Sequence, residues 1–536
     1  MQCWLRNGKQ VGYQGQTKAY PLISTGRETK FVIGLYLMGE IQEICQKISN
    51  LQNDDGGIED ASPGIHSLPV EILCHIFRMC IPDNHFKRPT HYSAPLLLGR
   101  VCKYWKDIAW NEATLWTRPR FSFPSGSTYT KSPLLRSTLE VYQKRSKDAD
   151  FDLSVNQTSG FNINGATDDL EALLDTLPRC RGLWMSCQER LWLELFNGLS
   201  RLVLRRLEYI FIKIHSPSGE LRLRNAPRLR AVRLHLVHPG CLSLFTLPYT
   251  QLLDLSCVLG RDRSRTSSPA VDAWRSLLVK CPNLRVIEAY FQGYGLDRSN
   301  LIRSSIMSAK FDHVRKIIIR LGFRTNLANI LNGFSFPIIE ELHVIATSHP
   351  VCLLPPTVSF FEGLNTTLSY VSRLTSLRLI RVSFASSELQ ALLQATPLIT
   401  SLDIMLGVFH HASFEIKDEH LRFLLTILDF GQELHPVIPL LCHLRLYLKV
   451  NDDILQEYNG AQYAAVAHSR YRWMSIHANT SENPKISKPL PSYPFRLYLK
   501  YELDGKDIIP AVARAIGSTA FPVLWPELLS CFMKER

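Results

Sequence analysis

The stretch PRLRAVRL, residues 227–234, sets a pattern that recurs along most of the chain. A proline is followed at fixed spacing by three apolar residues, Leu229, Val232 and Leu234. The last four residues alternate between apolar and other side chains, as a strand buried on one face does. The stretch therefore predicts a proline turn that leads into a short, half-buried strand.

The same pattern returns throughout the sequence. Copies that keep the proline begin at Pro178, Pro248, Pro282, Pro337, Pro397 and Pro439, and copies that keep only the apolar positions begin at Asn197, Asp312 and Ser372. Helical patterns precede several copies, at residues 168–177, 270–281 and 386–396. Each of these patterns ends just before the proline, as helices tend to do. The repeating unit is therefore a helix, a proline turn and a strand.

A helix that crosses over between successive strands makes those strands parallel neighbours. Units stacked along one axis form a solenoid with strands on one side and helices on the other. The spacing between units varies from 19 residues (Cys180 to Leu199) to 42 (Ile399 to Leu441). We therefore expect an α/β fold in which residues 150–510 form an irregular array that resembles leucine-rich repeats, with a cap or tail over residues 511–536.

A basic cluster lies near the start of this array. It consists of Arg201, Arg205, Arg206, Lys213, Arg222, Arg224, Arg228, Arg230 and Arg233, opposed only by Glu208 and Glu220. One interpretation is a solvated face, because alternate strand positions must be polar. The other is a groove for an acidic or phosphorylated substrate, because arginine pairs bidentately with carboxylate and phosphate. RNA is a third and less favoured ligand, since no aromatic-rich RNA-binding signature accompanies the charge.

A separate apolar helix is predicted over LPVEILCHIF, residues 68–77. Pro69 suits the first turn of a helix, and Glu71 lies where the helix dipole favours a carboxylate. The apolar stripe of this helix consists of Leu68, Ile72, Leu73, Ile76 and Phe77. A second helical pattern starts at Leu96 and places Val101, Trp105, Ile108 and Ala109 on one face. Together these patterns predict a helical unit that is too small to be stable without a neighbour or a partner.

These two segments, in this order, resemble the F-box over residues 65–120. The matching elements are Leu68-Pro69-x-Glu71-Ile72-Leu73, Ile76-Phe77, Val101-Cys102, Trp105, Ile108-Ala109 and Leu115-Trp116. An amphipathic helix and acidic linker over residues 40–64, followed by the box and an irregular repeat region, look like the large F-box group of mushroom-forming fungi. Residues 1–39 show no clear period and are left unassigned.

The resemblance implies docking to a Skp-type adaptor, and through it to a cullin, in a ubiquitin ligase. The residues that would bind the adaptor are Leu68, Pro69, Ile72, Leu73, Ile76, Phe77, Val101, Trp105 and Ile108. Trp105 and Ile108 would mainly hold the box together. The repeat array would then hold an unknown substrate protein. The alternative is a non-catalytic repeat scaffold, able to bind nucleic acid, with a degenerate box.

Composition narrows the remaining choices. The 536 residues carry a formal charge of +13, and no apolar run reaches the ~18 residues that a membrane span needs. The 13 cysteines include no CxxC pair, which favours reduced thiols in a cytoplasmic or nuclear protein. Common catalytic motifs such as GxSxG and HExxH are absent from the sequence, and His410-His411 and Cys442-His443 are poorly spaced for zinc. We therefore expect a binding protein without catalytic activity, metal or cofactor.

Overall fold

The structure is a computed structural model that forms two compact units, Met1–Trp116 and Thr117–Arg536. It describes residues 68–81, 94–123, 133–157, 167–187, 189–214, 220–260, 268–292, 308–321, 327–331, 333–346, 373–380, 382, 386–406, 438, 440–448 and 496–501. The segments assigned above to residues 1–39, 40–64 and 511–536, and the pair His410-His411, lie outside these residues.

The first unit is called here the helical unit, and its described residues, 68–81 and 94–116, form four short elements. They are α2 (Val70–Met79), the 3-10 turn η3 (Leu98–Arg100), α3 (Lys103–Asn111) and the 3-10 turn η4 (Ala113–Trp116). The predicted second helix is divided, because Cys102 is extended at φ −157° and ψ 171° and begins α3 as its N-cap. Val101 therefore precedes the helix, and its predicted place on the helix face beside Trp105 is wrong.

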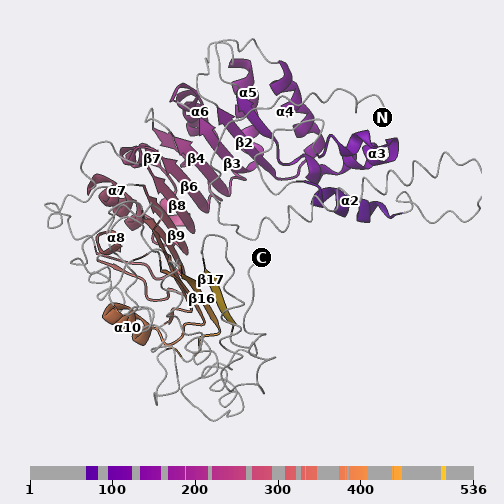
Figure 1. Cartoon of the computed structure of the whole chain (residues 1–536). Coiled ribbons are helices and arrows are strands. Elements are labelled where there is room, and N and C mark those ends of the chain that lie inside the picture. Colours follow the sequence, from indigo (N-terminus) through magenta and orange to yellow (C-terminus); the bar gives the residue numbers. More distant parts are fainter. Residues whose placement is uncertain are drawn as a thin grey trace, which may run out of the picture. The chain divides into compact units, whose positions relative to one another are not determined.

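The second unit, called here the sheet unit, is built on a parallel sheet of 13 strands (Figure 1). In spatial order the strands are β1 (Arg120–Phe123), β2 (Phe151–Gln157), β3 (Cys180–Cys187), β4 (Tyr209–Ile214), β6 (Ala231–Leu236), β8 (Asp254–Leu259), β9 (Val286–Phe291), β11 (Lys316–Leu321), β13 (Glu341–Ala346), β14 (Ser376–Ile380), β15 (Ser401–Leu406), β16 (His443–Leu448) and β17 (Arg496–Tyr501). Each strand pairs with the next strand of the sheet along the chain. Two short parallel pairs accompany the sheet, β5 (Leu221–Arg222) with β7 (Phe245–Thr246) and β10 (Ala309–Lys310) with β12 (Phe334–Ser335).

Helices lie along one side of the sheet (Figure 1). They are α4 (Pro133–Ser146), α5 (Thr167–Thr176), α6 (Glu189–Arg201), α7 (Ser268–Val279), α8 (Leu327–Leu331) and α10 (Ser386–Ala395). Every second strand residue is buried, as in β4, β6 and β9. The core is therefore a layer of leucine, isoleucine and valine between sheet and helices, each side chain contributing about 1.5–3 kcal/mol.

A backbone ladder runs along the amino-terminal edge of the sheet. From β4 to β16, the residue just before each strand of the sheet donates its amide N–H to the carbonyl oxygen of the equivalent residue one strand earlier, at 2.7–2.9 Å; the first acceptor, Arg181, is the second residue of β3. The residues of this edge ladder are Arg181, Glu208, Arg230, Leu253, Arg285, Arg315, Glu340, Thr375, Thr400 and Cys442. Because the bonds join main-chain groups, they hold the register of successive loops whatever the side chains are.

The predicted α/β class, with a helical N-terminal region and a large parallel sheet, is confirmed. The three predicted helices correspond to α5, α7 and α10. The strand predicted from the copy at Asn197 is wrong, because that copy lies mostly in α6 and the strand follows at Tyr209–Ile214. The sheet also begins at Arg120, before the expected start of the array at residue 150.

Candidate functional site

The helix predicted over residues 68–77 is present as α2, shifted by two residues to Val70–Met79. Pro69 is the N-cap of α2, Glu71 lies in the first turn and Arg78 in the last, and both charges complement the helix dipole. The Arg78 guanidinium also lies 3.8 Å from the Glu112 carboxylate, which follows α3. This ion pair joins α2 to the end of α3.

A compact aromatic core joins α2, α3 and η4. The ring centroids of Phe77 and Trp105 lie 4.9 Å apart. The Trp116 indole N–H donates to the carbonyl oxygen of Ala109 at 2.8 Å. The preceding residue, Leu115, is also buried. These contacts hold α2, α3 and η4 together.

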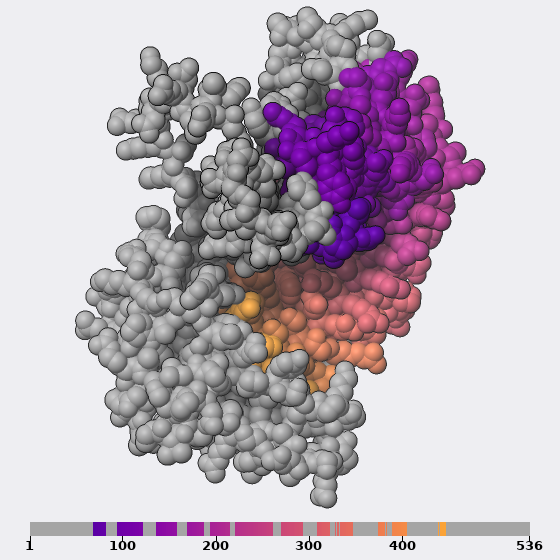
Figure 2. Space-filling view, turned by 90° about the vertical axis from the view of Figure 1, so that its right-hand side faces the viewer, coloured from indigo at the N-terminus to yellow at the C-terminus, as the bar shows by residue number. Residues whose placement is uncertain are grey.

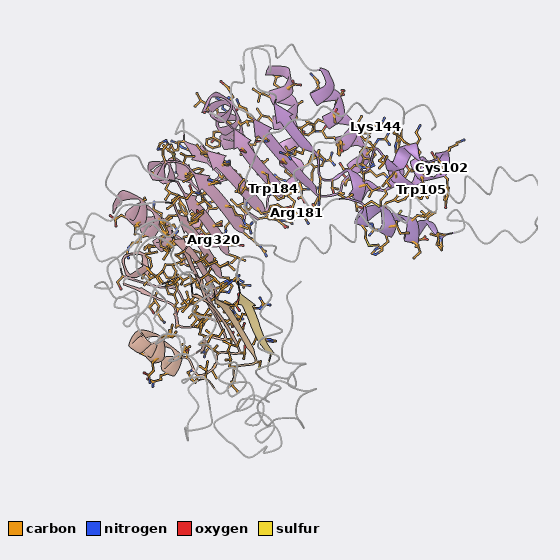
Figure 3. The ribbon with its side chains drawn as sticks, in the orientation of Figure 1. Cys102, Trp105, Lys144, Arg181, Trp184 and Arg320 are labelled. Atoms are coloured by element: carbon orange, nitrogen blue, oxygen red, sulfur yellow. The ribbon has the colours of Figure 1, made fainter. Side chains whose placement is uncertain are left out.

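A cysteine caps the second helix. The Sγ of Cys102 accepts a hydrogen bond from the backbone N–H of Trp105 at 3.4 Å, and Figure 3 shows the two side chains in the same part of the unit. In α2, burial raises the pKa of the Cys74 thiol, and the Glu112 carboxylate raises it further. The free thiols of the described residues include Cys74, Cys80 and Cys102 in the helical unit.

Four large apolar side chains of the helical unit remain exposed. They are Val70 (45% exposed), Ile72 (48%), Met79 (54%) and Val101 (45%). Figure 2 shows the indigo residues of this unit at the molecular surface. Exposed apolar side chains mark a protein-binding site where they form a contiguous patch.

Residues 65–122 match the F-box-like family. The predicted resemblance over residues 65–120 is confirmed in these terms. F-box domains in general bind Skp-type adaptors, and this domain indicates a general role as a ubiquitin ligase adaptor. No curated protein shows significant similarity to the chain.

The F-box-like domain divides the nine predicted adaptor-binding residues into two groups. Leu73 and Phe77 are 0% exposed, and Trp105 and Ile108 are buried, so these four form the core of the domain. Pro69, Ile72 and Val101 are exposed, and Leu68 and Ile76 are half-buried. The side chains of Leu73 and Phe77 pack against their own chain, and their direct contact with the adaptor stays a prediction. Adaptor binding by the exposed group stays a prediction.

Val70 and Met79 extend the exposed group, and the sequence reasoning missed both. Val70 lies within residues 68–77 but not in the stripe, and Met79 lies two residues after Phe77; they are the first and last residues of α2. Their apolar character was the available signal. Only the packing of Leu73 and Phe77 shows which way the helix faces.

The residues of the basic cluster lie on several elements of the sheet unit. Arg222 lies on β5 and pairs with Glu220 at 2.7 Å, away from the main sheet. Arg233 lies on the face of β6 opposite the buried residues Val232 and Leu234. Arg205, Arg206 and Arg228 of this cluster line a common pocket.

This pocket, called here the edge pocket, is an open cavity of about 720 Å³. It is lined by Asp148, Asp150, Val203, Arg205, Arg206, Pro227 and Arg228. These residues lie in three loops that lead into β2, β4 and β6, so the pocket is on the amino-terminal edge of the sheet. The sequence reasoning missed the two aspartates.

The loop that carries the aspartates is fastened to its neighbours. Arg179 donates to the carbonyl oxygens of Gln143 (3.2 Å) and Lys147 and to the Ser146 hydroxyl (3.3 Å), at the end of α4. Arg206 donates to the carbonyl oxygen of Asp148 at 3.0 Å. Hydrogen bonds between the loops therefore hold the edge pocket in shape.

The face of the sheet opposite the helices is called here the open face. At its first strands the rings of Trp184 and Tyr209 meet edge to face at 4.8 Å, and Figure 3 marks Trp184 on β3. The buried Asp152 carboxylate lies 3.3 Å from Arg181 and 3.5 Å from Arg118. Burial would lower the pKa of Arg181, but Asp152 more than offsets this, so the pKa is raised.

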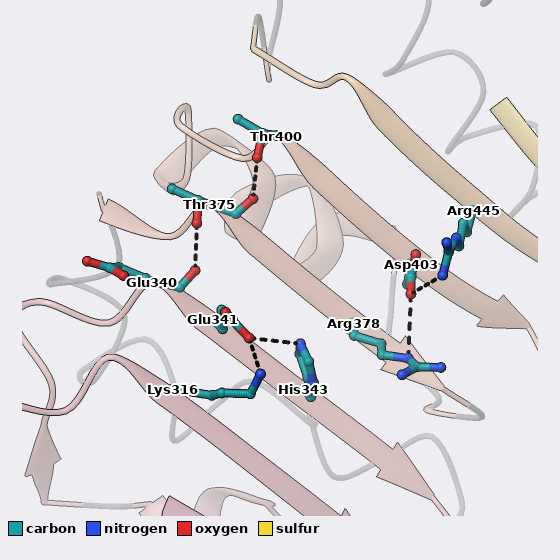
Figure 4. Close-up of polar contacts among 9 residues, drawn as sticks. All are labelled: Lys316, Glu340, Glu341, His343, Thr375, Arg378, Thr400, Asp403 and Arg445. Carbon is teal, nitrogen blue, oxygen red and sulfur yellow. Dashed lines mark hydrogen bonds and ion pairs between the residues drawn. The ribbon is translucent and has the colours of Figure 1, made fainter. Parts of the chain in front are cut away.

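Charged side chains are paired farther along the open face (Figure 4). Asp403 lies 3.5 Å from Arg378 and 4.0 Å from Arg445, and Glu341 pairs with Lys316. His343 stands 3.7 Å from Glu341, yet burial, together with Lys316, lowers its pKa to about 4. His343 is therefore neutral at physiological pH. Beside the edge ladder, the hydroxyls of Thr375 and Thr400 donate to main-chain oxygens at 3.1 Å.

Two further findings apply to the described part of the chain. None of its helices is both long and apolar enough to span a membrane. Its histidines, cysteines and carboxylates also form no group that could hold a metal ion.

Proposed function

We propose that the chain is a substrate-recognition subunit of a Skp/cullin/F-box type ubiquitin ligase. One observation within the residues that match the F-box-like family supports this proposal. Leu73 and Phe77 are buried in the core of the domain, whereas four apolar side chains remain exposed: Val70, Ile72, Met79 and Val101. Apolar side chains of this kind supply most of the binding energy in a stable protein interface.

The sheet unit supplies the second half of the proposal. Its parallel strands, its helices on one side and its edge ladder support an irregular leucine-rich-repeat-like solenoid that holds a substrate protein. This arrangement is similar to the large F-box group of mushroom-forming fungi. In this role the chain contributes binding and positioning, with no catalysis or cofactor of its own, and works in the cytoplasm or nucleus.

The test is co-purification of the full-length chain with a Skp-type adaptor. Ile72→Asp combined with Val101→Asp should abolish the complex, because each change places a charge in the apolar interface. Val141→Asp is the matched control, since Val141 is comparably exposed but lies on α4 of the sheet unit. An adaptor that still binds the double variant would refute the docking assignment. Binding to nucleic acid with steep salt dependence, and no adaptor, would favour the scaffold alternative instead.

Variants at Leu73 or Phe77 do not provide this test. A charge at either residue would enter the core and unfold the helical unit, because both side chains are fully buried. Loss of the adaptor would then follow from unfolding, whatever the interface is.

A further inference from the structure

Two of the three arginine side chains that line the edge pocket are not paired in the described part of the chain. Arg205 and Arg228 are exposed, and neither makes an ion pair with any described residue. Arg206 is half-buried and held by the carbonyl oxygen of Asp148. The guanidinium groups of Arg205 and Arg228 are therefore available to bind an anion, whereas that of Arg206 is held in place.

The charge balance of the pocket selects among anionic ligands. Three arginines and two aspartates line it, which leaves a formal charge of +1. A single carboxylate balances that charge, whereas a phosphate group near −2 would face repulsion from Asp148 and Asp150. The guanidinium fork also matches a carboxylate with two parallel hydrogen bonds.

The other residues that line the pocket could contact the methylene groups and the backbone of a peptide. Val203 is 51% exposed and Pro227 is exposed, so they offer apolar contact to the methylene groups of a side chain. The carboxylates of Asp148 and Asp150 are acceptors, and backbone N–H groups of a peptide are donors. Beyond the pocket, the edge ladder continues with the exposed residues Arg230 and Arg285. They would favour further acidic residues along the same edge.

We propose that the edge pocket binds a glutamate side chain of an acidic peptide segment in the substrate protein. The carboxylate would pair with Arg205 and Arg228, and the methylene groups would lie on Val203 and Pro227. This inference rests on the proposed function and names the substrate class that the sheet unit recognises.

The experiment measures the fluorescence anisotropy of a labelled glutamate-rich peptide on the full-length chain. Arg205→Glu combined with Arg228→Glu should weaken binding about tenfold or more, because charge-assisted hydrogen bonds are replaced by repulsion. Arg224→Glu is the control, since Arg224 is equally exposed and close in sequence but does not line the pocket. Equal weakening by the control would overturn the proposal, because general attraction to a basic surface would then suffice.

Asp150→Asn gives a prediction of opposite sign. It removes a negative charge and keeps an acceptor oxygen, so the affinity should rise a few-fold. Glu140→Gln, exposed on α4 and paired with Arg136, should leave the affinity unchanged. Lower affinity in Asp150→Asn would contradict the assigned charge balance.

Two competing probes separate the ligand classes. A peptide with phosphoserine in place of glutamate should bind more weakly, and single-stranded RNA should not displace the glutamate-rich peptide. Tighter binding of either would overturn the assignment. Adaptor co-purification is followed in the same samples: failure of the wild-type chain to bind adaptor overturns the proposed function alone. Unchanged peptide affinity in the double variant, with adaptor bound, overturns the pocket assignment alone.

Discussion

The rings of Phe77 and Trp105 lie 4.9 Å apart and join the two main helices of the F-box-like domain. Both side chains are almost fully buried in a domain with few other large core residues. The contact therefore links the first and second halves of the box, which are separated in the sequence.

Trp105→Ala should destabilise the F-box-like domain by about 3–5 kcal/mol, enough to unfold so small a unit. Trp105→Phe should cost much less, because an aromatic ring remains against Phe77 and the indole N–H has no hydrogen-bond partner among the described residues. Hydrogen–deuterium exchange of peptides from α2 and α3 measures the effect. Equal protection in the alanine variant and the wild type would show that the ring contact is dispensable.

Adaptor affinity should follow exposed apolar area and not total apolar content. Met79→Ala and Ile72→Ala should each weaken adaptor binding by about 1–2 kcal/mol while leaving the fold intact. Isothermal titration with purified adaptor gives the affinities, and circular dichroism checks the fold. Val279→Ala on α7, similarly exposed in the other unit, should change neither.

The cap of α3 should improve when its sulfur is replaced by oxygen. Cys102→Ser keeps a side-chain acceptor for the Trp105 N–H and provides a better one, whereas Cys102→Ala removes it at a cost of about 1 kcal/mol. Thermal unfolding of the two variants should therefore bracket the wild type. An alanine variant as stable as the serine variant would mean that the cap contributes nothing.

Gly182 on β3 is needed because the ring of Tyr209 covers it. A Cβ built at Gly182 would overlap the atoms of that ring, so Gly182→Ala should destabilise the sheet unit by about 1–3 kcal/mol. Tyr209→Ala in the same chain should recover part of the loss, since the obstructing ring is gone. Gly240→Ala is the control, because a Cβ there would meet no heavy atom within 4 Å. Chemical denaturation of the three variants and the wild type tests this.

His343 should make the sheet unit sensitive to mild acid. Its folded pKa of about 4 lies below the unfolded value of about 6.5, so the unfolded state binds more protons between these values. The free energy of unfolding should therefore fall by up to about 3 kcal/mol as the pH drops from 6.5 to 4. His343→Gln should flatten that part of the profile. An unchanged slope in the variant would assign the acid sensitivity to other groups.

Some features could be predicted from the sequence because they depend on local pattern alone. The proline turn and alternating apolar residues at Pro227 located β6, and the same pattern located most later strands. The prediction placed the strand at Tyr209–Ile214 too early in the sequence. No proline marks its turn, and the residues near Asn197 have the same apolar spacing although they lie in a helix.

Other features depend on contacts between distant residues. The apolar stripe of α2 does not show that Leu73 and Phe77 face inward while Ile72 faces water, since the choice is made by Trp105. In the same way, the arginines of the edge pocket were visible as a cluster. Asp148 and Asp150 join them only because the loops before β2 and β4 are brought together across β3.

The edge ladder has a consequence for how such a protein can diversify. Main-chain amides and carbonyls make the hydrogen bonds from one strand to the next, so no particular side chain is needed for them at the exposed residues Arg230 and Arg285. Substitutions there can alter what the rim attracts without loosening the framework beneath. A lineage that must track changing targets could thus rewrite its recognition surface one residue at a time.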